Sequence, residues 1–335
     1  MDALSHDNLV LLFGGLMGVA IMAYVLLDGY DLGVGVLLAR AHGHEREEMV
    51  NAIAPFWDAN ETWLVLGAGI LLVAFPLAHG IILKELYLPV LVMLVGLILR
   101  GTAFELRVKS PPERLEAWNT MFVVGSGTAA LAQGFMLGLF VVAFRTDLEA
   151  LLFACLVAPA LVAGYALLGA SWLLIKTEGE LQRRAARWGR TALWLTAGGI
   201  GLVSLATPLV SPRIFDKWFS AGLIPLLAIG PVLVGGGVLW LSRWLQRFDP
   251  QRDDDRAWVP LAVTVAIFLV SGAGLAFSAF PYLVIDRLTL WDAAASSATL
   301  RMILLGVAIV LPPIIVYSAF SYRIFRGKTT HLEES

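Results

Sequence analysis

Long apolar segments alternate with short polar segments along the whole chain. About 20 apolar residues are needed for a helix to cross the hydrocarbon core of a bilayer, and each apolar segment reaches that length. The short alternating strands of a membrane β-barrel are missing from the pattern, so the backbone groups must bond within each segment, as they do in helices. We therefore predict an all-α integral membrane protein with nine transmembrane helices. The predicted spans are residues 9–38, 52–78, 82–106, 119–143, 151–175, 191–210, 221–244, 258–283 and 300–324.

Composition supports this class of protein. Of the 335 residues, 59% are hydrophobic and only 15% are charged, which is too apolar for an ordinary soluble domain. The connections are too short for a soluble domain, so the chemistry must lie within the membrane or with a partner. The first ten residues, MDALSHDNLV, lack a basic region and no cleavage pattern follows, so we expect the first span to be retained. Cys155 is the single cysteine, which excludes an intrachain disulfide and a cysteine pair for zinc or an iron–sulfur cluster.

Lysine and arginine indicate the orientation. If the N-terminus is outside, 17 of the 24 basic residues fall in inner connections or at inner span ends, and only 6 fall on the outer side. The positive-inside rule then places the N-terminus outside and the C-terminus in the cytoplasm. The RDDDR run at residues 252–256 lies in one of the inner loops, and we interpret it as a solvated loop rather than a cation site.

Charged side chains gather near the cytoplasmic ends of the first three predicted spans. The first span carries two carboxylates three residues apart, in VLLDGYDLGVG. The second begins NAIAPFWDANETWLV and carries two more on one helix face, with Trp57, Asn60 and Trp63 around them. The third contains LILRGTAFELR, which brings Arg100 and Glu105 to the same side. The gathered residues are Asp28, Asp31, Asp58, Glu61, Arg100 and Glu105.

Two interpretations of this cluster are open. Arg100 could pair with one aspartate and hold the helices together, while Glu61 and Glu105 extend to the interface. However, five acids cannot all be neutralised by one arginine, and an ionised carboxylate in hydrocarbon costs several kcal/mol. Surplus carboxylates at one depth are what a proton entry path or a cation site requires. The residues alone leave the proton entry path and the cation site both open.

Other motifs have structural interpretations. The Gly29 and Gly33 pair has the G-x-x-x-G spacing that lets helices approach closely, and we interpret it as packing. In LTLWDAAASSATLRM, Asp292 beside Trp291 is interpreted as a helix N-cap on the outer side. The histidines lie in tails, loops and span ends, so we expect this chain to bind no haem through histidine and no other metal. They are His6, His42, His44, His79 and His331.

The motifs together resemble subunit II of the cytochrome bd-type quinol oxidases. The resemblance rests on LLDGYDLGVG, NAIAPFWDANETWLV, LRGTAFELR, LTLWDAAASSATL and LPPIIVYSAFSYRIFRGK, in this order over almost the whole chain. The D-G-[FY]-D-x-G-V-G and W-D-x-N motifs are specific when they occur together. The short length is compatible with the cyanide-insensitive branch of this family.

The resemblance implies a haem-free subunit of a bacterial plasma membrane enzyme that oxidises quinol and reduces O₂ to water. A haem-bearing subunit I would carry haems b558, b595 and d, and the chain alone would not be catalytic. Asp58 matches the family aspartate assigned to a proton pathway, and Asp28, Asp31 and Arg100 match charged residues near it. The family also includes members with a structural quinone or with a small accessory membrane subunit. The residues of this chain do not indicate where either would bind.

The resemblance further implies two four-helix bundles and a ninth helix, which divide the chain at residues 1–145, 146–285 and 286–335. The expected partners are the bilayer, subunit I and quinol. A small accessory membrane subunit stays open, and no nucleic acid is expected to bind. Two other functions remain open from the residues alone. One is a secondary transporter that uses the same acids for a cation or for proton coupling. The other is a purely structural scaffold for a catalytic partner.

Overall fold

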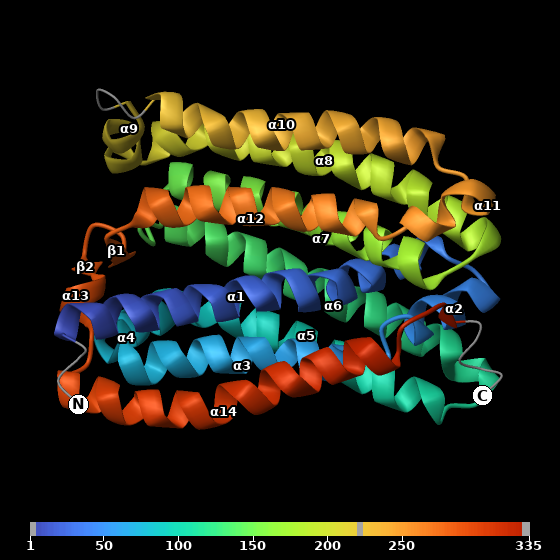
Figure 1. Ribbon diagram of the computed structural model, residues 1–335, viewed down its shortest axis with the longest axis horizontal. Coiled ribbons are helices and arrows are strands. Elements are labelled where there is room, and N and C mark those ends of the chain that lie inside the picture. The colour runs from blue at the N-terminus through green and yellow to red at the C-terminus, as the bar shows by residue number, and fades with distance from the viewer. Residues whose placement is uncertain (1–4, 220–223, 330–335) are drawn as a thin grey trace. The chain divides into compact units, whose positions relative to one another are not determined.

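The computed structural model describes residues 5–219 and 224–329, which are almost entirely helical (Figure 1). Eight helices in these residues are long and apolar enough to cross a membrane, and a bent pair, α3 with α4, would make a ninth. The long helices are α1 His6–Leu37, α3 Trp57–Ala74, α5 Tyr87–Val108, α6 Leu115–Val141, α7 Leu148–Lys176, α8 Gly179–Val210, α10 Ile224–Arg247, α12 Val259–Ala279 and α14 Ser297–Ile324. The short helices are η1 Leu38–Arg40, α2 His44–Asn51, α4 Pro76–Glu85, η2 Pro112–Arg114, α9 Pro212–Phe219, α11 Pro250–Asp253, η3 Asp254–Arg256 and α13 Leu290–Ala293.

The second predicted span differs most from the structure. Residues 52–78 were expected to form one helix, but α3 begins only at Trp57 and ends at Ala74. The chain then bends by 120° into α4. Pro76 explains the bend, because a proline disfavours helical geometry in the residue before it, and Phe75 has φ −130° and ψ 57°. The seventh predicted span starts at residue 221, which lies outside the described residues.

A short hairpin was not predicted. The eighth span was expected to continue to residue 283, but α12 ends at Ala279. Pro281 cannot donate a backbone hydrogen bond, and β1, Tyr282–Val284, follows it directly. This strand pairs antiparallel with β2, Leu288–Thr289, through Tyr282 opposite Thr289.

The helices form two compact units that interleave along the sequence. Unit 1 comprises residues 1–28, 55–86 and 279–326. In this unit α3 packs against α14, and α4 contacts the hairpin and α13 (Figure 1). Its core includes Tyr24 of α1 and Trp63 of α3, with Leu311 of α14 against them. Three distant stretches of sequence therefore meet in one apolar core.

Unit 2 comprises residues 29–54, 87–278 and 327–335. Here α5, α6, α7 and α8 pack in chain order, and α10 lies beside α8 (Figure 1). The last turns of α1 belong to this unit and come very close to α7: a Cβ added at Gly33 would overlap the carbonyl group of Tyr165. The helical fold class predicted from the sequence is confirmed, whereas the division at residues 145 and 285 stays a proposal.

Candidate intramembrane acidic site

The two carboxylates of α1 are fully buried. Asp28 and Asp31 each have 0% of their surface exposed, and both lie on the same continuous helix. Three residues correspond to a little less than one helical turn, so the two carboxylates occupy neighbouring positions on the helix surface. Glycines on both sides of Asp31 let α1 approach other helices of unit 2. A Cβ at Gly29 would stand 2.9 Å from the Tyr165 ring, and one at Gly35 would overlap Ser126.

The carboxylates of α3 are less buried than those of α1. Asp58 lies in the first turn and its side chain is exposed on the surface of this chain, while Glu61 is half-buried. This chain alone therefore does not desolvate the Asp58 carboxylate. The reason is geometric: the helix starts at Trp57, so Asp58 precedes the part of α3 that packs deeply, which includes Trp63 at 8% exposed.

Asn60 holds α3 to the other helices of unit 1. Its amide nitrogen donates to the Leu27 carbonyl at 3.4 Å, next to Asp28, and its amide oxygen accepts from the Tyr322 hydroxyl at 3.1 Å. Asn60 is only 1% exposed, so these bonds satisfy a polar group that would otherwise be costly to bury. Tyr322 also stacks on Phe56, with ring centroids 4.7 Å apart. Asn60 therefore ties the start of α3 to α1 and α14, and Trp57 beside it is half-buried.

The charged residues of α5 lie in different environments. Arg100 is 2% exposed, whereas Glu105 is exposed. Seven residues from Arg100, on the same side of α5, the sequence analysis missed a second buried arginine. Arg107 is 9% exposed and its Nε donates to the Asn119 side chain of α6 at 2.8 Å. The seven-residue spacing was the signal that could have found it.

Of the six gathered residues, Asp28, Asp58 and Glu61 belong to unit 1, and Asp31, Arg100 and Glu105 belong to unit 2. Within unit 1, the hydrogen bond from Asn60 to Leu27 brings the start of α3 next to the turn of α1 that contains Asp28. The gathering of all six residues at one depth stays a proposal.

Asp292 has a different local role from the one predicted. The N-cap of α13 is Thr289, whose hydroxyl accepts from the Asp292 backbone N–H. The Asp292 carboxylate in turn accepts from the Thr289 backbone N–H at 3.0 Å and from its hydroxyl at 2.6 Å. This reciprocal pair is a capping box, with Asp292 at the third helical position. The hydrogen bond from the Thr289 hydroxyl lowers the pKa of Asp292 most, and the hydrogen bond from the Thr289 N–H lowers it less, so this pKa lies below its usual value. Trp291 contacts Phe280 edge-on, with centroids 6.0 Å apart.

The helices and the buried charges define a multi-pass α-helical membrane protein with ionisable groups inside its spans. The family model for cytochrome bd terminal oxidase subunit II matches residues 9–325, so the chain belongs to this family. It is therefore a subunit of a respiratory terminal oxidase of the bacterial plasma membrane, in which subunit I is its partner.

Individual relatives agree over nearly full length. The chain is 27% identical over 351 residues to the cytochrome bd ubiquinol oxidase subunit 2 of Bacillus subtilis, covering 95% of this chain and 96% of that one. It is 29% identical over 364 residues to the cytochrome bd-I ubiquinol oxidase subunit 2 of Escherichia coli, covering 94% and 93%. The bd oxidase structure from Geobacillus thermodenitrificans contains a chain of the same fold, with a TM-score of 0.73 and 17% identity. The match covers 95% of this chain and 99% of that one.

Proposed function

We propose that this chain is the haem-free subunit of a quinol:O₂ oxidoreductase and that it contributes to proton uptake from the cytoplasm. Reduction of O₂ to water consumes protons, and buried carboxylates are side chains that can bind and release them. The observation that carries the proposal is the pair of fully buried carboxylates on one span, Asp28 and Asp31. Membership of a terminal oxidase family does not favour the alternative of a secondary transporter.

The exposed carboxylates support a path that continues beyond this chain. On α3, Asp58 is followed at seven-residue intervals by Val65, 68% exposed, and Leu72, 50% exposed. On α5, the same spacing leads from Glu105 back to Ile98, 66% exposed. A carboxylate on an apolar face is costly in lipid, so it is stabilised by water or by protein. We therefore propose that subunit I covers Asp58 and Glu105, and that Asp58 passes protons between the two subunits.

The described residues of this chain do not fit a haem held by two histidines within a span. His6 starts α1, His44 starts α2, His42 lies just before it, and His79 belongs to the short helix α4. No group of three metal-binding side chains occurs in the part of the chain that the structure describes. We therefore place haems b558, b595 and d in subunit I. Whether the complex also holds a structural quinone or an accessory subunit stays open.

Purification through a tag on this chain tests the proposed assembly. We expect a complex that contains a second membrane subunit and haem, and that consumes O₂ when quinol is supplied. After the subunits are separated in detergent, the haem absorbance should follow the partner, because the described residues place no pair of histidines within a span. Stoichiometric haem on the separated chain would contradict its haem-free assignment.

Single cysteines test the proposed orientation. With Cys155 replaced, Ser5→Cys before α1 should react with an impermeant thiol reagent on intact cells from which the outer membrane, if any, has been removed. Ser110→Cys, between α5 and α6, should react only after the membrane is opened, because the basic loops face the cytoplasm. A gel shift of this chain measures both reactions. The reverse pattern would refute the cytoplasmic location of the acids.

A further inference from the structure

Residues near the C-terminus close one end of α7. The last carbonyl groups of a helix have no partner within the helix and need donors from elsewhere. Lys328 Nζ donates to the Thr177 carbonyl at 3.0 Å and reaches the Leu174 carbonyl at 3.5 Å. The Thr329 hydroxyl donates to the Lys176 carbonyl at 3.1 Å. We call Gly327–Thr329 the C-terminal latch, because it supplies donors and a positive charge to the negative end of the α7 dipole.

A pair of side chains, one from η3 and one from α8, holds the latch in place. Asp254 of η3 accepts from Lys328 Nζ at 2.5 Å and from Gln182 Nε2 at 2.6 Å. Gln182 also donates to the Leu174 carbonyl at 2.8 Å. The C-terminal end of α7 therefore receives a hydrogen bond from α8 as well as from the latch. Burial raises the pKa of Asp254, but the hydrogen bonds from Lys328 and Gln182 outweigh burial, so the pKa lies below its usual value. Asp254 is therefore the ionised partner that Lys328 needs.

The latch also contacts a buried lysine. Lys176 is 3% exposed, and its Nζ donates to the Gly327 carbonyl at 3.1 Å. The same Nζ lies 5.4 Å from the centroid of the Trp172 ring, within the range of a cation–π interaction. A buried ammonium group is costly unless it is compensated, so losing the latch carbonyl would destabilise the position of Lys176.

Trp172 connects this lysine to the acidic turn of α1. Its ring stacks on Tyr30, with centroids 4.3 Å apart and planes 18° apart, and its Nε1 donates to the Ala52 carbonyl at 2.9 Å. Trp172 is 5% exposed and Tyr30 is 2% exposed. Tyr30 directly precedes Asp31 in α1. Fixing the Tyr30 ring therefore also fixes the backbone of the helical turn that carries the Asp31 carboxylate.

We propose that the C-terminal latch, through Lys176 and Trp172, fixes the turn of α1 that carries Asp31, so that Lys176 is a positioning residue for proton uptake. This inference rests on the proposed function, because it assigns a task to a residue outside the acidic set. The chain of contacts runs from Gly327 to Lys176, from Lys176 to Trp172, and from Trp172 to Tyr30, all within unit 2.

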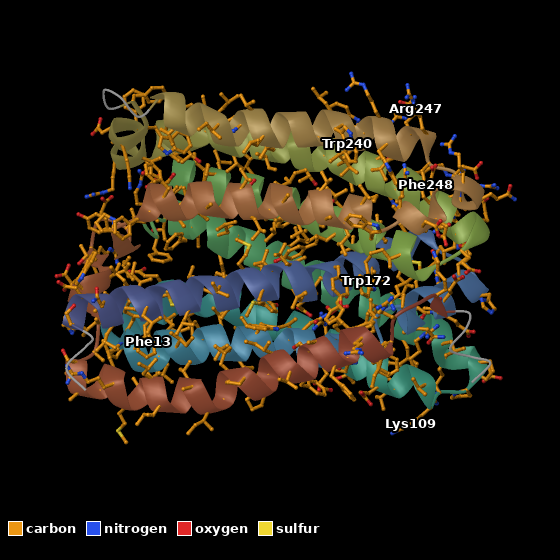
Figure 2. All side chains as sticks on the ribbon, in the orientation of Figure 1. Phe13, Lys109, Trp172, Trp240, Arg247 and Phe248 are labelled. Atoms are coloured by element: carbon orange, nitrogen blue, oxygen red, sulfur yellow. The ribbon has the colours of Figure 1, made fainter. Side chains whose placement is uncertain are left out.

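Hydrogen exchange on the assembled complex tests the contacts directly. Lys176→Met and Lys328→Met keep most of each side-chain stem and remove the ammonium group. The matched control is Lys109→Met, because Lys109 is exposed at the end of α5 (Figure 2). Losing a charged hydrogen bond should make amides of residues 29–37 and 172–177 exchange at least about tenfold faster. Unchanged exchange in both variants, or the same increase in the control, would overturn the proposal.

Turnover distinguishes positioning from general stability. We expect Lys176→Met to lower kcat for quinol-dependent O₂ consumption at unchanged quinol KM and haem content, and Lys176→Arg to restore it. Wild-type kcat in Lys176→Met would overturn the positioning role, and so would a kcat that falls only with haem content. Asp31→Asn tests the proposed function separately: if this variant turns over normally, the proton pathway is wrong, while the exchange data still decide whether the latch holds α1.

Discussion

Asp58→Asn is expected to lower quinol-dependent O₂ consumption of the assembled oxidase by about 100-fold, the scale of losing one proton-transferring group. Asparagine keeps the shape and hydrogen-bonding capacity of aspartate but cannot bind and release a proton. Because the Asp58 side chain is exposed on this chain, the substitution removes little packing within it. The haem spectrum and the yield of complex should therefore stay near the wild-type values.

Asp292→Asn is the matched control. It makes the same chemical change at an exposed carboxylate whose partner is Thr289, in a local capping box. Asparagine retains an acceptor there, so turnover should change by less than about twofold, as expected for a conservative surface change. Wild-type turnover in Asp58→Asn at normal haem content would refute the relay. Loss of assembly in step with activity would instead support the scaffold interpretation, in which Asp58 only holds subunits together.

The positions of the spans could be predicted because the bilayer imposes a simple rule on sequence. A segment that crosses hydrocarbon must be apolar for about 20 residues, so the predicted spans 119–143 and 151–175 agree with α6 and α7 within a few residues. The rule is less informative where a helix continues into water. The α8 helix begins at Gly179, well before the predicted start at 191, because its first turns are charged and lie outside the apolar segment.

Local breaks were present in the sequence but were outweighed by hydropathy. Pro76 lies inside an apolar run that averages as one span, yet it divides that run into α3 and α4. Pro281 similarly precedes the strand that replaces the end of the eighth span. In both places a single residue determines the backbone, whereas a window average responds mainly to its many apolar neighbours.

Burial of individual acids could not be predicted, since it depends on which helices pack together. Asp28 and Asp58 both lie in predicted spans, but Asp28 is fully buried and Asp58 is exposed on this chain. The Tyr30 and Trp172 contact joins residues 142 positions apart, so no local pattern indicates it. Likewise, the G-x-x-x-G spacing at Gly29 and Gly33 indicated close packing without giving the partner, which is α7.

Gly33→Ala is expected to prevent assembly of most of the complex. A Cβ at Gly33 would overlap the carbonyl group of Tyr165, and a Cβ at Gly169 on α7 would overlap the Gly33 backbone in return. Because both sides of this contact are backbone, no side-chain rotation can relieve it, and the helices must move apart. The cost should reach at least about 3 kcal/mol, the upper part of the range for overpacking. Yield of haem-containing complex and its thermal inactivation temperature measure the loss.

Gly18→Ala on the same helix is the control, because a Cβ there would meet nothing within 4 Å. Alanine is the better helix former, so this variant should assemble as well as wild type or slightly better. Gly169→Ala should reproduce the defect of Gly33→Ala, since it enters the same contact from the other helix. If Gly33→Ala assembles normally, then α1 and α7 are further apart than this packing requires. The latch would then lose its route to the acidic turn, because Tyr30 and Trp172 also meet between α1 and α7.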